Sequence, residues 1–487
     1  MKFSEYFNTN KGQSGLDFVD IFLEKDIKLF IDPWAIRESS GQFSIECISV
    51  IDNFFQLLIK KISKGDDDGA IDMLSFSHEV KEMHLGNSLN SYNGLGMSDK
   101  QARDIFKALK ESKAVKTGII QDLEDCALMI EGINKDKISD MVANIIKLPL
   151  IRYTQEQCAL YNIPTTKVAA GYYWDTEEQN WVSVSAELPI VEVKGRSDKI
   201  LLVPKSIVRR DLSLNYEEFY NMDILAFEQS RYLNACHSLV RTLKNGQKRA
   251  PFKKDIKKDV GKGKAVIVEY VTKHPELISL YKDRKNKLFK PISNLEILVS
   301  KKESFDEIAD IDEKIDALKK LQGGKKDAYK YHDLTISILN ILFYPHLSKP
   351  RKEDIIDSGR KKVDIVYNND ALSGFFMRAV RKSISADKVF FECKNYTEDI
   401  ANPEIDQLAG RLTRNTSRLG FLLCRNIEDR QKVLSSCRFH YHGNGNCLII
   451  LDDNDIIKLL ELKKLEKEDE INDFLNEKFD ELTKVDD

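Results

Sequence analysis

A carboxylate and an ammonium group stand two residues apart at the end of an apolar run. The run is residues 390–395, with the sequence FFECKN. If it forms a β-strand, the side-chain period of two places Glu392 and Lys394 on one face and Cys393 on the other. A second apolar run, residues 362–367, contains Asp364. Because burying an unpaired carboxylate is costly, acids inside two strands need a partner, and a metal ion bound between them is the natural one.

These residue types match what hydrolysis of a phosphodiester requires. A hard divalent cation stabilises charge on the phosphoryl oxygens and lowers the pKa of bound water, and oxygen ligands suit Mg²⁺ or Mn²⁺. We expect Asp364 and Glu392 to bind one such ion, with the carbonyl oxygen of Cys393 as a further ligand. Lys394 would lie beside the ion, where its charge can position the attacking water. Its role as a general base depends on its pKa.

The predicted elements around these residues follow a definite order. Apolar periodicity and turn signals predict a helix over 327–342, a weak strand over 353–356 and strong strands over 363–368 and 388–396. A second helix is predicted from residue 402 onward. Pro403 directly after Asn402 is a good helix start signal. Further strands are expected over 419–424 and 448–451. The strands therefore carry the acids, and the second helix carries Gln407.

This order resembles the PD-(D/E)XK superfamily, the restriction-endonuclease-like nucleases, and its Mrr-like branch most closely. The resemblance covers roughly residues 325–455 and rests on Asp364, Glu392, Lys394 and Gln407. It implies a mixed β-sheet flanked by helices, with those four residues catalytic in a Mg²⁺- or Mn²⁺-dependent DNA endonuclease. It also implies a role in restriction or anti-phage defence. An RNA-directed nuclease and a nucleic-acid-binding regulatory protein with a non-cleaving core are the alternatives.

Several further residues are candidates for supporting roles. The superfamily often has a Glu on its first helix, and this chain offers Asp333 there; Glu353 is the other candidate for an additional acid. Gln407 could reach a metal-bound water or a phosphate, and it could equally be a surface glutamine. Three arginines follow it at helical spacing and are predicted phosphate contacts, although a solvated helix face has the same pattern. They are Arg411, Arg414 and Arg418.

A second basic stretch lies outside this region. Residues 241–264 carry ten Lys or Arg against two Asp, with glycines interspersed. Such a stretch can follow a phosphate backbone, and a solvated surface loop is an equal alternative. The candidate nucleic-acid contacts in it are Lys248, Arg249, Lys253 and Lys254.

Two other clusters could carry chemistry, and we interpret both as structural. Residues 192–194 are a second Glu-x-Lys, but a hairpin rather than a helix is predicted after them and no acid-bearing strand precedes them. A group of two cysteines and two histidines is compact, but it lacks the paired spacing usual in zinc sites. Its members are Cys437, His440, His442 and Cys447.

The whole chain is too long for a single core, so we predict a multi-domain α/β protein. The expected parts are a mainly helical region for sensing or recognition (1–165), a β-rich and then basic, helical region (166–322), the nuclease core (323–455) and an amphipathic helical tail (456–487). Two glycines after a charged helix, Gly323 and Gly324, mark the boundary before the core.

Charge and cysteine usage bound the setting. The net charge of −3 is too small to attract a polyanion through an overall field, so any such surface must be local. Eight scattered cysteines do not resemble a disulfide framework, which favours reduced thiols in a cytoplasmic protein. No apolar run approaches the ~20 residues of a membrane span, so we expect no membrane partner. DNA, or alternatively RNA, is the expected partner, and we expect a homo-oligomer.

Overall fold

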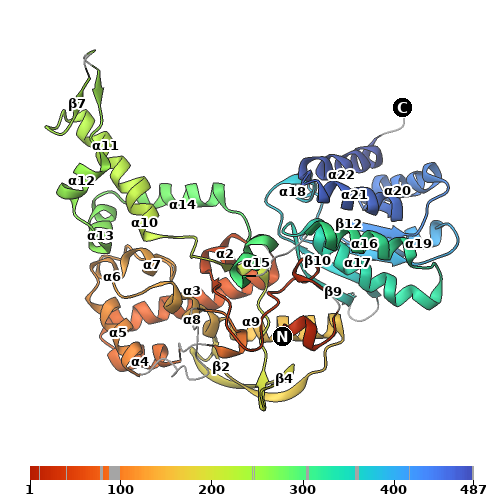
Figure 1. Cartoon of the computed structure of the whole chain (residues 1–487), viewed down its shortest axis with the longest axis horizontal. Coiled ribbons are helices and arrows are strands. Elements are labelled where there is room, and N and C mark those ends of the chain that lie inside the picture. Colours follow the sequence, from red (N-terminus) through yellow and green to blue (C-terminus); the bar gives the residue numbers. More distant parts are fainter. Residues whose placement is uncertain are drawn as a thin grey trace.

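A computed structural model of the chain shows an N-terminal body, a projecting arm and a C-terminal region built on a sheet (Figure 1). It describes residues 1–9, 11–39, 41–76, 80–86, 99–243, 245, 247–302, 307–356, 361–415 and 417–484. The α/β class predicted from the sequence is confirmed. Helices dominate the N-terminal part, strands follow them, and a mixed sheet forms the C-terminal side.

The N-terminal body is mainly helical as far as Tyr161. Its elements are α1 (Phe3–Tyr6), η1 (Gln13–Gly15), β1 (Phe30–Ile31), α2 (Pro33–Glu38), α3 (Gln42–Lys64), α4 (Asp67–Ser75), η2 (Lys81–Met83), α5 (Asp99–Glu111), α6 (Lys113–Lys116), α7 (Asp125–Met129), α8 (Lys135–Ile145) and α9 (Lys147–Tyr161). Apolar residues recur at helical spacing in α3, so one face of it is buried. The helix ends at Gly65, whose left-handed backbone (φ 77°) glycine adopts without steric cost.

Two β-hairpins complete the N-terminal body. They are β2 (Thr166–Asp175) with β3 (Asn180–Leu188) and β4 (Ile190–Val193) with β5 (Arg196–Lys199); η3 (Lys205–Ile207) and β6 (Val208–Arg209) follow, and β6 pairs with β1. Trp174 and Trp181 lie opposite each other in the first hairpin. Their ring centroids lie 4.9 and 5.8 Å from that of Phe54 in α3. The hairpin is therefore packed onto the helical core.

One described helix, α3, is long and apolar enough to cross a membrane by length and composition. Core helices of soluble proteins often meet the same criterion. In this structure its apolar face, which includes Phe54 and Leu58, packs inside the N-terminal body.

The arm comprises residues 216–288 and projects away from the rest of the molecule (Figure 1). Its elements are α10 (Tyr216–Glu218), the π-helical η4 (Phe219–Ile224), α11 (Leu225–Asn234), the hairpin strands β7 (Arg241–Thr242) and β8 (Lys248–Arg249), α12 (Lys253–Val260), α13 (Lys264–Lys273) and α14 (Glu276–Leu288). Ion pairs and hydrogen bonds hold its base on the N-terminal body. Lys264 Nζ donates to the carbonyl oxygens of Ile130 and Ile133, and Lys282 pairs with Asp125 at 2.7 Å.

The C-terminal region contains a five-stranded sheet in the order β13-β12-β11-β10-β9. The strands are β9 (Leu347–Ile356), β10 (Lys361–Asn369), β11 (Lys388–Lys394), β12 (Leu419–Cys424) and β13 (Cys447–Asp452). Strand β10 is antiparallel to both β9 and β11, whereas β11, β12 and β13 run parallel to one another. The sequence-based prediction of a mixed sheet flanked by helices is confirmed.

Helices flank this sheet. They are η5 (Lys325–Asp327), α17 (Ala328–Phe343), α18 (Gly374–Arg381), α19 (Asn402–Ala409), α20 (Arg430–Asn444), α21 (Asp453–Lys464) and α22 (Glu468–Thr483). Two helices precede the sheet: α15 (Asn294–Lys301) contacts η1 of the N-terminal body, and α16 (Glu307–Lys320) packs on α17 and α21. The predicted tail is two helices, and both pack on β13. The helical conformation is interrupted between them, where Glu466 has a left-handed backbone (φ 57°).

Helix α17 lies between the sheet and the N-terminal end of the chain. Every residue from Thr335 to Phe343 is buried, so this part of the helix is enclosed on all sides. On one side Asn340 donates to the carbonyl oxygen of Gly15 at 2.8 Å. On the other, the ring of Phe343 contacts those of Phe391 and Phe421 in the sheet. The two ends of the chain are therefore joined through this helix.

Candidate active site

The two predicted strand acids lie side by side at one end of the β10–β11 pair. The antiparallel register pairs Ile365 with Phe391, so Asp364 and Glu392 are opposite each other one step further along. The alternation of side chains along β11 then separates its residues between two faces. Cys393 faces α17, where Thr335 lies beside its thiol. Glu392 and Lys394 face α19.

Glu392 is the most buried charge of this group, with 1 % of the residue exposed. Lys394 Nζ donates to its Oε1 at 2.9 Å, and Arg411 Nη1 donates to its Oε2. The side chain of Arg411 is itself 11 % exposed. Both carboxylate oxygens therefore have a cationic partner, which is the usual requirement for a charge buried this deeply.

Lys394 also contacts the helix that follows its strand. Its Nζ donates to Gln407 Oε1 at 2.9 Å. Gln407 projects from the exposed side of α19, so the ammonium group lies between a buried carboxylate and a surface amide. The structure thus brings together Asp364, Glu392, Lys394 and Gln407, the four residues predicted to be catalytic.

Asp364 lies in a different environment from Glu392, because 26 % of its side chain is exposed. Its Oδ2 accepts a hydrogen bond from the Cys393 N–H at 3.0 Å and lies 3.3 Å from His332 Nε2. Burial alone would raise the pKa of Asp364, but the bonds from His332 and Cys393, together with the charge of Lys394, outweigh it and lower the pKa below its usual range. Asp364 is therefore held as a carboxylate.

His332 is a site residue that the sequence analysis did not find. It stands in the first turns of α17, next to Asp333, which was the predicted acid on this helix. Asp333 instead accepts from Lys11 Nζ at 3.1 Å, and the same ammonium donates to Ser337 Oγ at 2.6 Å. Adjacent helix positions point about 100° apart, so these two neighbours face different partners. Asp333 was named as the acid that this helix offers in place of the superfamily's Glu, and its neighbour His332 is the residue that approaches Asp364.

Of the three arginines predicted to contact phosphates, only one lies in the site. Helix α19 ends at Ala409, so the prediction of a helix continuing through Arg411, Arg414 and Arg418 is wrong. Gly410 is a poor helix former, and a bridge between Thr413 and Ser417 turns the chain back toward β12. Arg411 enters the site, whereas Arg414 is exposed. The guanidinium of Arg418 lies close to Gly445, at the end of α20.

The remaining candidates lie elsewhere. Glu353 is in β9, but its side chain falls outside the described residues. Lys248, Arg249, Lys253 and Lys254 are in the arm. The second Glu-x-Lys ends β4 and is followed directly by β5, as predicted. In the cysteine–histidine cluster, His440 pairs with Asp406 at 2.7 Å, and Cys437 and Cys447 are buried.

Among the described residues, no three His, Cys, Asp or Glu side chains gather closely enough to form a metal cage. Mg²⁺ does not require one, because proteins usually hold it through one or two carboxylates together with waters and substrate phosphates. Within the described part of the chain, Asp364 Oδ1 has no hydrogen-bond partner, and this carboxylate is the more exposed of the two. Asp364 and Glu392 therefore fit a hard divalent cation in donor type and in their neighbouring positions on β10 and β11, and Arg411 would have to release Glu392.

Comparison with known proteins gives one match. Residues 8–215 match the model of a family described as a domain of unknown function (DUF8370). No curated protein and no solved structure matches the chain. The family match covers less than half of the chain and crosses the predicted boundary at residue 165. It ends at Asn215, whose side chain caps the first helix of the arm. The arm and the candidate active site both lie outside it.

Proposed function

We propose that the protein is a metal-dependent nuclease that hydrolyses phosphodiester bonds of DNA at the site formed by Asp364, Glu392 and Lys394. The observation that carries the proposal is the convergence of these three side chains, from two antiparallel strands, on one end of a mixed sheet. Their types and strand placement are those of the PD-(D/E)XK pattern that the sequence resembles. On that resemblance alone we extend the proposal to restriction of foreign DNA.

Mg²⁺ or Mn²⁺ held by Asp364 and Glu392 would supply a Lewis acid for the phosphoryl oxygens and a bound water of lowered pKa. The protein's own groups do the rest. Lys394, fixed by Glu392 and Gln407, is placed to hold the attacking water or a phosphate oxygen at the edge of the site. Arg411 would exchange Glu392 for a phosphate oxygen of the substrate, an acceptor that matches the guanidinium fork.

A second candidate function follows from the same geometry. Both oxygens of Glu392 are already neutralised by Lys394 and Arg411. A site closed in this way could serve a nucleic-acid-binding protein that does not cleave. Such a protein would bind DNA or RNA without turnover in any divalent metal.

A cleavage assay on the purified full chain tests the proposal. Supercoiled plasmid, linear duplex DNA and single-stranded RNA are incubated with Mg²⁺ or Mn²⁺. We expect DNA cleavage that falls at least about 100-fold in Lys394→Ala and in Asp364→Asn, the scale of losing one charge-stabilising group. Lys194→Ala, from the second Glu-x-Lys, is the matched control and should cleave normally.

Each other outcome is informative. Full activity in both site variants would overturn the assignment of the site. Faster cleavage of RNA than of DNA would replace the substrate class but keep the chemistry. Binding without turnover across both metals would favour the non-cleaving alternative.

A further inference from the structure

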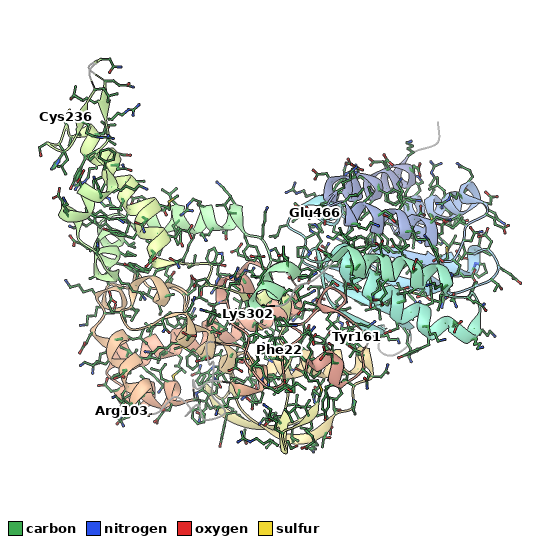
Figure 2. All side chains as sticks on the ribbon, in the orientation of Figure 1. Phe22, Arg103, Tyr161, Cys236, Lys302 and Glu466 are labelled. Carbon is green, nitrogen blue, oxygen red and sulfur yellow. The ribbon has the colours of Figure 1, made fainter. Side chains whose placement is uncertain are left out.

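The end of the arm concentrates positive charge in a chain that is slightly acidic overall. Residues 241–264 contain ten Lys or Arg and two Asp, against a net charge of −3 for the whole protein. The described residues up to Val260 form the hairpin β7–β8 and α12, whereas Lys264 begins α13 at the base of the arm. Cys236, just before the hairpin, marks the outer end of the arm (Figure 2). A local cationic surface of this kind attracts polyanions even when the net charge does not.

The cations of the arm fall into two groups. Those near its base are used internally: Lys264 binds backbone carbonyls of the N-terminal body, Lys282 pairs with Asp125, and Arg284 pairs with Asp223 at 2.7 Å. At the outer end, Lys248 donates to Cys236 Sγ and Lys253 donates to the carbonyl oxygen of Asn221. Arg249 and Lys254 are exposed and have no acidic partner within the described residues, so these two cations are available to an external anion.

One cross-strand pair of the hairpin is electrostatically unfavourable without such an anion. Arg241 on β7 lies directly opposite Arg249 on β8, and like charges directly opposite on a sheet destabilise it. Arg241 is partly compensated, since it donates to the carbonyl oxygen of Ala250 at 2.9 Å and its guanidinium lies 3.7 Å from the ring centroid of Phe252. Arg249 has no such compensation among the described residues. A phosphate beside Arg249 would relieve the repulsion.

The same contacts indicate what form the polyanion takes. Phe252 is 50 % exposed and would be the obvious platform for an unpaired base. However, Arg241 covers a face of the ring and Lys254 lies 5.5 Å from its centroid. The surface is therefore suited to phosphates rather than to base stacking. A two-stranded β-ribbon fits the major groove of a duplex, with α12 alongside the backbone.

We propose that the hairpin β7–β8 and the start of α12 form a second contact site for duplex DNA, separate from the candidate active site. The choice of DNA as the polyanion rests on the proposed function. The hairpin and the C-terminal sheet lie toward opposite ends of the longest axis of the molecule (Figure 1). A single ligand that touches both must therefore be long, and the arm would favour long duplexes over short ones.

Binding measurements on the full chain without divalent metal test this, because cleavage is then absent. Fluorescence anisotropy compares a duplex of about 40 base pairs, on the order of 140 Å at 3.4 Å per pair, with one of about 12. The variant combines Arg249→Glu with Lys254→Glu. The control combines Lys60→Glu with Lys64→Glu, two exposed lysines of α3, and makes the same change in charge.

We expect the arm variant, but not the control, to bind the long duplex about tenfold more weakly. The slope of log K against log salt should fall by about 0.9 for each phosphate that the variant no longer neutralises. The preference for the long duplex should shrink. Single-stranded RNA is measured as a further ligand. Equal affinities of the arm variant and the control for the long duplex would overturn the proposal, as would a weakening confined to the RNA. If the proposed function is wrong instead, metal fails to produce cleavage while the arm-dependent binding persists.

Discussion

Glu392 is the buried charge of the candidate site on which its electrostatic balance depends. It is almost fully buried, and its two oxygens are held by Lys394 and Arg411. A buried carboxylate with one partner removed is left partly uncompensated, which is far more costly than losing a surface ion pair. In the proposed function, a divalent cation would therefore compete with Arg411 for one oxygen of this carboxylate.

This competition predicts the behaviour of Arg411→Ala. Without metal the variant should be less stable than the wild type by about 3 kcal/mol, because Glu392 keeps only Lys394 as a partner. Mn²⁺ should restore part of this loss, so the rise in Tm on adding Mn²⁺ should be larger in the variant than in the wild type. Differential scanning fluorimetry with and without Mn²⁺ measures both effects.

Arg414→Ala is the control, since that side chain is exposed outside the site. An Arg411→Ala protein with wild-type stability, or with a smaller response to Mn²⁺ than the wild type, would contradict the competition.

Sequence reasoning could place the acids of this site and Lys394, but it predicted neither His332 nor the contact of Arg411 with Glu392. The period of two along a strand is rigid, so the spacing of Glu392 and Lys394 is enough to put both on one face of β11, and Asp364 could be assigned to a neighbouring strand. Arg411 enters the site only because α19 ends at Ala409, and helix ends are weakly encoded. His332 required the rotational setting of α17, which depends on packing from both sides.

At the scale of elements, α17 connects the site to the N-terminal end of the chain. His332 approaches Asp364, and Asp333, the next residue, holds the buried ammonium of Lys11. Burial lowers the pKa of Lys11, while Asp333 counteracts the effect. The helix thus presents His332 to the candidate metal site and Asp333 to Lys11, which lies near the start of the region that matches the family.

Substitutions of Asp333 and Asp364 should therefore have different effects on stability and on metal binding. Asp333→Ala should reduce stability by about 2 kcal/mol, the scale of a hydrogen bond to a charged group, and leave the affinity for Mn²⁺ unchanged. Asp364→Asn should weaken Mn²⁺ binding strongly. Isothermal titration calorimetry gives the affinities and chemical denaturation gives the stabilities.

Lys11→Met provides the matched test of this contact, because it removes the buried ammonium group that Asp333 would otherwise have to neutralise. It should cost less stability than Asp333→Ala. Loss of Mn²⁺ binding in Asp333→Ala would instead support the acid predicted from the sequence for this helix.

The elements themselves were predictable where apolar periodicity was strong. The helix over 327–342 and the strands over 363–368 and 388–396 correspond to α17, β10 and β11 within a few residues. The end of the helix at Ala409 was not predictable, because charged residues can stand at helical spacing in a segment that forms no helix. The tail was predicted as one amphipathic stretch, and only the left-handed backbone at Glu466 divides it.

For the whole molecule, the enclosure of α17 means that the C-terminal sheet does not stand alone. Asn340 of this helix bonds to Gly15, and Gln157 at the end of α9 donates to the carbonyl oxygen of Pro350 in β9 at 3.3 Å. Tyr161, which closes α9, lies beside the C-terminal region (Figure 2). Separation of the two parts would expose apolar and polar groups of α17 that are now buried.

We therefore predict that a fragment spanning residues 307–487 is much less stable than the intact chain. Circular dichroism should show a broad, low-temperature transition for the fragment, and a hydrophobic dye should bind it more strongly, because one side of α17 becomes exposed to water. A fragment that melts cooperatively at the temperature of the full chain would show that the sheet is an independent domain, as the boundary predicted at Gly323 and Gly324 implies.

The central claim is that Asp364 and Glu392 hold a divalent cation together. The most direct measurement is a crystal structure of the full chain soaked in Mn²⁺, with an anomalous difference map calculated at a wavelength where manganese scatters strongly. We predict one peak at about 2.0–2.3 Å from oxygens of both carboxylates, with Arg411 moved away from Glu392. A map with no peak at these two side chains, and Arg411 still bound to Glu392, would contradict the account.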